Sequence, residues 1–178
     1  EDVEKFRAAV VKYVVPVASS IYREQAARLG KSYPMNFADN ALMFRSGNPK
    51  PCGTPAEILA QGKHFYEELS PETGEFFNTM LDNELLDVLS TPGKRAGGYC
   101  TSLGDYHVPF IFANFNGTQH DVEVVTHEAG HAFAAWLNRD RIPQSYIWPS
   151  LEACEVHSMS MEFFAWPWAD GFFGADAR

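Results

Sequence analysis

The stretch His127-Glu128-Ala129-Gly130-His131 decides how the rest of this sequence is interpreted. It has the pattern H-E-x-x-H and lies within residues 121–138, which are predicted to form a helix capped by Asp121. Apolar residues recur at helical spacing through this segment: Val122, Val125, Ala129, Ala132 and Trp136. Side chains four residues apart on a helix differ by about 40° around the axis and about 6 Å along it. His127 and His131 can therefore place nitrogens on a single Zn²⁺.

The carboxylate inside the motif has a different expected role. Glu128 is turned by about 100° from His127 around the helix. From there it can reach a water on the metal without becoming a ligand itself. Metal-assisted hydrolysis needs this arrangement, with Glu128 as the general base. The alternative interpretation of the motif is an exposed helix that carries two ordinary histidines.

A third metal ligand is expected, because catalytic zinc usually has three protein ligands and one open position. A last helix is predicted from Pro149-Ser150 to about Ala165, and three of its residues are glutamates: Glu152, Glu155 and Glu162. Spacings of three and seven place all three on one face. Because this helix is expected to lie opposite the two histidines, its glutamates favour a third metal ligand. The simpler alternative is that they form a solvent-exposed edge of the helix. The spacing alone leaves open which glutamate coordinates the metal.

Two more side chains of this predicted helix lie near the candidate ligands. Glu162 can orient a ligand histidine, and a surface carboxylate is the alternative interpretation. His157 comes two positions after Glu155 and points away from the metal face. A role in packing or in support of a ligand is favoured for His157.

The N-terminal half is predicted to be helical. Residues 1–29 form one helix that ends at Gly30 and is kinked at Pro16, which removes a backbone donor. Thr54-Pro55-Ala56-Glu57 has the pattern of a capping box with proline at the first helical position. Ser70-Pro71-Glu72 begins another helix in the same way.

Strand material is limited to two runs, at residues 99–102 and 109–114, which predict a short antiparallel pair. The strand at 109–114 is expected to be an edge that pairs with an extended peptide. Ala113 is small enough to let a substrate backbone approach there. An ordinary half-buried hairpin is an equally good interpretation. The whole pattern predicts a mainly α fold with a small antiparallel β-sheet.

The composition excludes several classes of function. The 178 residues fit one domain, and 14 Lys and Arg against 23 Asp and Glu give a net charge of −9. A basic groove for nucleic acid is therefore not expected, and neither is binding to an anionic membrane surface. No apolar run approaches the roughly 20 residues of a membrane-spanning helix. Cys52, Cys100 and Cys154 are widely spaced, which favours free thiols in the reducing cytoplasm.

Taken together, these motifs resemble the oligoendopeptidase F branch of the thimet-oligopeptidase-like zinc metallopeptidases. Residues 127–131 match its H-E-x-G-H motif. In that branch a glutamate ligand lies 24 residues beyond the second histidine, and 131 + 24 = 155 selects Glu155 over Glu152. Glu162 matches a second glutamate seven residues on. The resemblance is clear over residues 93–170.

The resemblance implies a zincin-like catalytic core with one Zn²⁺ per chain, held by His127, His131 and Glu155. It implies hydrolysis of oligopeptides by an endopeptidase whose longer chain encloses a deep channel. The present chain is then a single catalytic-core region, 1–178, with a helical scaffold at 1–92 and the zinc site at 93–170. Other segments or chains would complete the channel and supply the residues that stabilise the transition state.

Two alternatives to an endopeptidase stay open at this point. One is a zinc carboxypeptidase or dipeptidyl carboxypeptidase on a related helical scaffold, which would need a group that binds the C-terminal carboxylate of the substrate. The other is a catalytically silent structural segment of a larger assembly.

Overall fold

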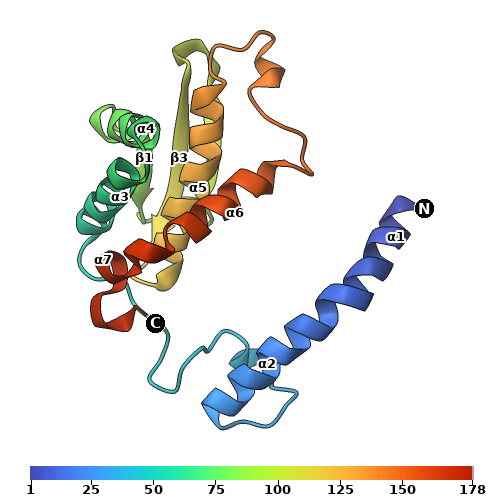
Figure 1. Ribbon diagram of the computed structural model, residues 1–178. Coiled ribbons are helices and arrows are strands. Elements are labelled where there is room, and N and C mark those ends of the chain that lie inside the picture. Colours follow the sequence, from blue (N-terminus) through green and yellow to red (C-terminus); the bar gives the residue numbers. More distant parts are fainter. Residues whose placement is uncertain (178) are drawn as a thin grey trace. The chain divides into compact units, whose positions relative to one another are not determined.

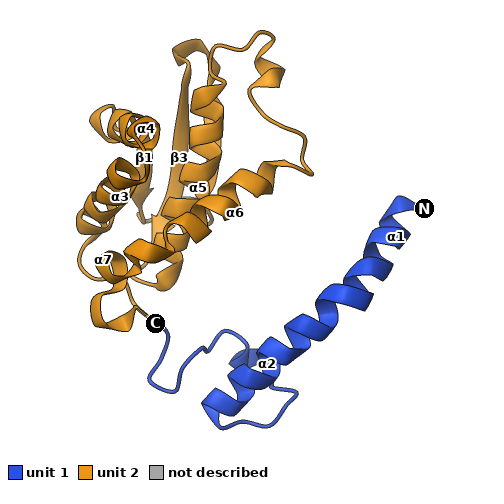
Figure 2. Cartoon of the chain, viewed as in Figure 1, with its two compact units in different colours: residues 1–48 blue, residues 49–178 orange. Residues whose placement is uncertain are grey.

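The computed structural model describes residues 1–177, and the chain divides into two compact units, residues 1–48 and 49–178 (Figure 2). The division lies well before residue 92, where the sequence analysis separated a scaffold from the zinc site. Helices α3 (Pro55–Leu69) and α4 (Pro71–Asp82) belong to the same unit as the H-E-x-x-H helix. This unit therefore carries both the predicted site and most of the apolar core.

The first unit is built on one long helical segment. It consists of α1 (Asp2–Ala9), a π-helical turn (Val10–Val14) and α2 (Val15–Leu29). The predicted helix over 1–29 is confirmed, and Gly30 closes it with a φ of 69°. The predicted irregularity at Pro16 takes the form of the π turn: the Val15 N–H bonds to the carbonyl of Val10, five residues back.

The second unit contains a three-stranded sheet in the order β1-β3-β2 (Figure 1). Its strands are β1 (Leu86–Leu89), β2 (Tyr99–Leu103) and β3 (Val108–Phe115). β2 and β3 form the predicted antiparallel pair, with Cys100 opposite Ile111. β1 pairs with β3 in parallel, so the sheet is mixed rather than antiparallel throughout. The sequence analysis missed β1 because four residues are too few to display an alternating pattern.

The prediction that the 109–114 strand is an edge is wrong. β3 is the central strand and pairs with a neighbour on both sides, so its main chain has no free edge for a peptide. Ala113 is 1% exposed and belongs to the apolar core, which removes the basis for its predicted substrate role. The edge on the antiparallel side of the sheet is β2.

The core lies between the sheet and the helices α3, α4 and α5. Its largest fully buried side chains are aromatic: Phe65, Tyr66, Phe76 and Phe77. The predicted capping box at Thr54 and Glu57 is confirmed, and the Ser70 side chain accepts a hydrogen bond from the Thr73 N–H at the start of α4. These caps fix where the two helices begin, because they satisfy backbone N–H groups of the first turn.

Helix α5 (Gln119–Leu137) carries the H-E-x-x-H motif and packs along the sheet (Figure 1). It begins two residues before Asp121, which is therefore not its cap. Instead, the buried Asp121 carboxylate accepts hydrogen bonds from the backbone N–H groups of Asn116 and Gly117, at 3.0 and 2.7 Å. The acidic side chain thus holds the loop between β3 and α5.

Helix α6 (Cys154–Phe164) crosses α5 and begins four residues later than predicted. Glu152 therefore lies in the turn before the helix, not on its glutamate face. Short segments complete the chain: η2 (Phe37–Asp39), η3 (Gly104–Tyr106), η4 (Gln144–Tyr146), η5 (Trp166–Trp168), α7 (Ala169–Phe173) and η6 (Gly174–Asp176). Within residues 1–177, no helix has the length and apolar character to cross a membrane.

Candidate metal centre

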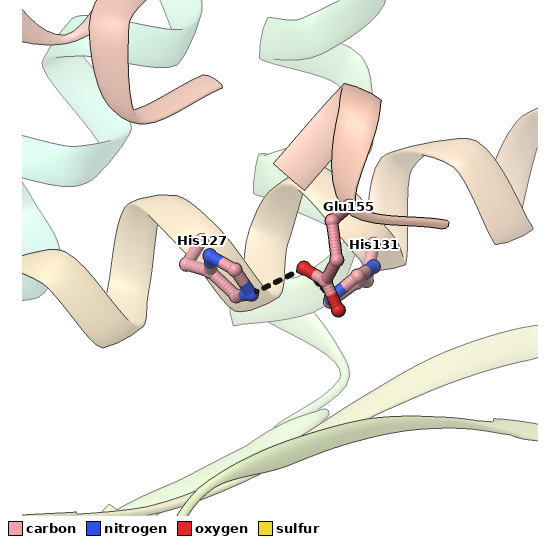
Figure 3. A group of neighbouring side chains, drawn as sticks. All are labelled: His127, His131 and Glu155. Carbon is pink, nitrogen blue, oxygen red and sulfur yellow. Dashed lines mark ion pairs between the residues drawn. The ribbon is translucent and has the colours of Figure 1, made fainter. Parts of the chain in front are cut away.

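The two histidines of α5 face a single carboxylate from α6 (Figure 3). The Nε2 atom of His127 lies 3.1 Å from Oε2 of Glu155, and the Nε2 atom of His131 lies 3.5 Å from the same oxygen. All three potential ligand atoms lie within 4.8 Å of one another. The structure thus brings together the three residues that the sequence analysis selected as metal ligands.

The approach of α6 to α5 depends on Gly130, the fourth residue of the motif. A Cβ atom at this position would lie 2.6 Å from the Cα atom of Ser158 and 3.0 Å from the carbonyl oxygen of His157. Both distances are too short for a side chain, so the two backbones touch only because residue 130 is glycine. This close crossing brings the first turn of α6 over the histidines.

Glu155 is held by a neighbour on its own helix. The Oγ atom of the fully buried Ser158 donates a hydrogen bond to Oε2 of Glu155 at 2.8 Å. This bond is the main reason why the pKa of Glu155 is lowered, and the nearby imidazoles lower it further. The carboxylate is therefore kept in its ionised form, which is the form that binds a metal.

The other ring nitrogen of each histidine has a polar neighbour from α6. The Nδ1 atom of His127 lies 2.6 Å from Oε1 of Glu162, and the Nδ1 atom of His131 lies 3.2 Å from Nε2 of His157. If Nδ1 of His127 donates to Glu162, its Nε2 atom keeps its lone pair toward Glu155. Glu162 therefore orients a histidine of the motif, which was one of its two predicted roles.

The residues fit a zinc ion by two criteria. Two imidazoles and one carboxylate form a donor set that catalytic zinc sites use. Tetrahedral ligands with bonds of about 2.0–2.2 Å are about 3.3–3.6 Å apart, and the nitrogen–oxygen separations of 3.1 and 3.5 Å are close to that spacing. Burial also lowers the pKa of His131, which favours the neutral imidazole that can coordinate a metal.

Glu128 lies on the side of α5 that faces β2, and its carboxylate is close enough to His127 and Glu155 for their charges to affect its pKa. Burial is the main cause of its raised pKa, and a hydrogen bond from the backbone of Cys100 in β2 acts in the opposite direction. Gly98, just before β2, lies near the carboxylate, since a Cβ there would be 3.9 Å from its Oε1 atom, at ordinary van der Waals distance. The predicted base is thus a half-buried carboxylate that the edge strand contacts.

Three side chains near the site depart from the sequence analysis or were missed by it. Glu152 is exposed and makes no contact with the histidines among the described interactions, in keeping with the choice of Glu155. Ser158 was missed, because a serine three residues after a glutamate is too common to signal a role. His157 was expected to point away from the metal face, in packing or in support of a ligand, and the structure places it 3.2 Å from Nδ1 of His131. The identity of this partner could not be predicted, because the contact depends on how the two helices cross.

Comparison with known proteins identifies the family. The family model described as peptidase family M3 matches residues 63–170, which include the whole of α5 and α6. The chain belongs to this family. The predicted resemblance to oligoendopeptidase F is confirmed, and the histidine-bearing helix pair lies inside the family region.

Individual relatives agree with this assignment. The chain is 30% identical over 95 residues to the oligopeptidase PepF of Bacillus subtilis, and 31% identical over 114 residues to the chromosomal oligoendopeptidase F of Lactococcus lactis subsp. cremoris. These matches cover 53% and 64% of the chain but only 14% and 17% of the relatives. The chain thus spans a small part of the length of these curated relatives.

Solved structures match almost the whole chain. A crystal structure from Bacillus anthracis, described as an oligoendopeptidase F, shares 51% sequence identity with a TM-score of 0.92. PZ peptidase A, solved with an inhibitor, shares 52% identity with the same TM-score. Each match covers 98% of this chain and about a third of the other, 32% and 31%. The zincin-like fold predicted for the core is therefore supported by close structural neighbours.

Proposed function

We propose that this chain belongs to a zinc-dependent endopeptidase that hydrolyses oligopeptides. The observation that carries the proposal is the arrangement of His127, His131 and Glu155, whose ligand atoms lie within 4.8 Å of one another on two crossing helices. Membership of peptidase family M3 supports peptide-bond hydrolysis. Preference for oligopeptides rests on the names of the relatives, an oligopeptidase and an oligoendopeptidase.

In this proposal His127, His131 and Glu155 hold the metal. When bound, zinc would lower the pKa of a water to about 7 and polarise the carbonyl group of the peptide bond. Glu162 keeps the Nε2 atom of His127 directed at the site, through its contact with Nδ1. Ser158 keeps the Glu155 carboxylate in place and ionised.

Glu128 is proposed as the group that moves the proton. It accepts a proton from the attacking water as the new carbon–oxygen bond forms, and it delivers that proton to the leaving amine as the carbon–nitrogen bond breaks. Its raised pKa suits the first step, because a more basic carboxylate takes up a proton more readily than an ordinary one. Glu128 is not one of the three residues that could hold the metal, which leaves it free for this role.

The test starts with metal content. The purified chain, dialysed against metal-free buffer, is expected to retain about one Zn²⁺ per chain, as measured by elemental analysis. Cleavage of oligopeptides blocked at both ends, with product analysis by mass spectrometry, then distinguishes an endopeptidase from an enzyme that needs a free C-terminus. A chain that retains no zinc would overturn the proposed metal site.

A further inference from the structure

The two histidines of α5 differ in what supports them. The imidazole of His127 is paired with the carboxylate of Glu162, which is the usual kind of partner for a metal-binding histidine. The imidazole of His131 has another imidazole, that of His157, at 3.2 Å. The rings of His131 and His157 are nearly perpendicular, at 84°, so they meet through ring nitrogens and not through stacked faces.

We propose that His157 is a positioning residue that fixes the ligand orientation of His131 by accepting a hydrogen bond from its Nδ1–H group. The inference rests on the proposed function, because it takes His131 as a metal ligand. The Nε2 atom of His131 faces Glu155 and must keep its lone pair to coordinate a metal. The ring proton of His131 is therefore on Nδ1, and the facing Nε2 atom of His157 is the acceptor.

The backbone around His157 favours this role over a chance contact. Its carbonyl oxygen lies within 3.0 Å of where a Cβ atom of Gly130 would be, so this part of α6 lies directly against α5. His157 follows Glu155 by two residues and the fully buried Ser158 comes next. One turn of α6 thus supplies a ligand, the serine that holds this ligand, and the acceptor for His131.

The acceptor is neutral, which distinguishes it from Glu162. A neutral imidazole fixes the direction of the His131 ring without adding a negative charge beside the site. Glu155 and Glu162 then carry the negative charge of the ligands and their direct partners. His157 adds no charge to the site. His157 is therefore expected to act on geometry and affinity for the metal, without changing the charge of the site.

Two variants of His157 test the inference. His157→Leu removes the acceptor, whereas in His157→Gln the side-chain oxygen can accept the same hydrogen bond near the position of Nε2. His64→Leu is the matched control, because His64 lies on the exposed side of α3 and pairs with Glu68. The affinity for Zn²⁺ is measured by competition with a chromogenic chelator. Absorption spectra of the cobalt(II)-loaded chain report the geometry around the metal.

The expected result is a loss of about 10- to 100-fold in zinc affinity for His157→Leu. His157→Gln should recover most of this loss, and His64→Leu should bind zinc like the parent. The cobalt spectrum should change in His157→Leu and return toward the parent in His157→Gln. Thermal unfolding of the metal-free chain should change little in either variant.

The inference is overturned if His157→Leu binds zinc as tightly as the parent. It is also overturned if both variants lose affinity equally and both unfold at lower temperature without metal, because that result indicates packing alone. These outcomes differ from failure of the proposed function. In that case the parent chain itself would bind no zinc, and the assignment of His157 would be overturned together with that of His131.

Discussion

Helices α5 and α6 build the two halves of the candidate metal centre in different ways. α5 supplies His127 and His131, whose separation of one helical turn is a property of the helix itself, and their side chains are only 28% and 13% exposed. α6 supplies Glu155, whose side chain is 53% exposed and whose position depends on contact with Gly130. One half is therefore fixed within a single helix, and the other by packing between two helices.

The largest expected effect separates chemistry from metal binding on α5. Glu128→Gln removes the proposed base but leaves both histidines and Glu155 in place. Peptide hydrolysis should fall by about 10²- to 10⁴-fold, the usual contribution of a general base, while zinc content stays that of the parent. Initial rates and elemental analysis on the same sample check this prediction. Cleavage at the parent rate would show that Glu128 is not the base.

The α6 half is tested by removing its ligand. Glu155→Ala should weaken zinc binding by more than about 100-fold, because the loss of a direct ligand should exceed the 10- to 100-fold effect of an indirect partner. Glu152→Ala is the matched control, three residues earlier and outside the helix, and should bind zinc like the parent. Affinities are compared by chelator competition. If Glu152→Ala weakens zinc binding and Glu155→Ala does not, Glu152 is the ligand.

The link between the two halves is tested at Gly130. The Cβ atom in Gly130→Ala would meet the backbone of Ser158, so α6 must move away from α5. We expect a loss of about 1–3 kcal/mol in the free energy of unfolding, as for other overpacked sites, together with weaker zinc binding. Gly74→Ala is a useful control, because the nearest atom to a Cβ there would be the Cα of Glu67 on α3, at 3.1 Å, and the three nearest atoms all belong to α3.

For Gly130→Ala, urea unfolding of the metal-free chain gives the stability, and chelator competition gives the affinity. Gly74→Ala should lose stability without a specific loss of zinc affinity. If Gly130→Ala keeps the parent affinity, the α6 half does not depend on the close crossing, and the contrast between the two helices fails.

The smallest expected effect concerns the support of Glu155. Ser158→Ala removes the hydrogen bond to Oε2 and leaves the helix unchanged, so zinc affinity should fall by about tenfold. Ser160→Ala, whose hydroxyl bonds only to a backbone carbonyl of the same helix, is the control. Isothermal titration of zinc into both variants checks this. Equal affinities would mean that packing alone holds the carboxylate.

The same contrast explains how much could be predicted from the sequence. The helix with the H-E-x-x-H motif was predictable, because its spacing and apolar period are local properties. Glu155 was not selected by spacing, which left three glutamates open, and only the family resemblance chose between them. The roles of His127, Glu128, His131 and Glu155 in binding and catalysis stay predictions until metal and activity are measured.

Features that depend on contacts between distant segments could not be predicted in this way. β1 is four residues long, and its parallel pairing with β3 joins segments separated by the whole β2 hairpin. This pairing makes β3 central and buries Ala113, which reverses the expected edge. The contact of His157 with His131 likewise follows from the crossing of two helices, which no short pattern encodes.

The unequal exposure of the ligands has a consequence for how fast a metal would enter and leave. Water and competing chelators can reach Glu155 directly, whereas His131 is largely covered by protein. Dissociation of a bound ion would therefore begin with release of the carboxylate and end at the histidines. Exchange in this chain should therefore depend on the concentration of a competing chelator, because the chelator can take the place of the exposed carboxylate first.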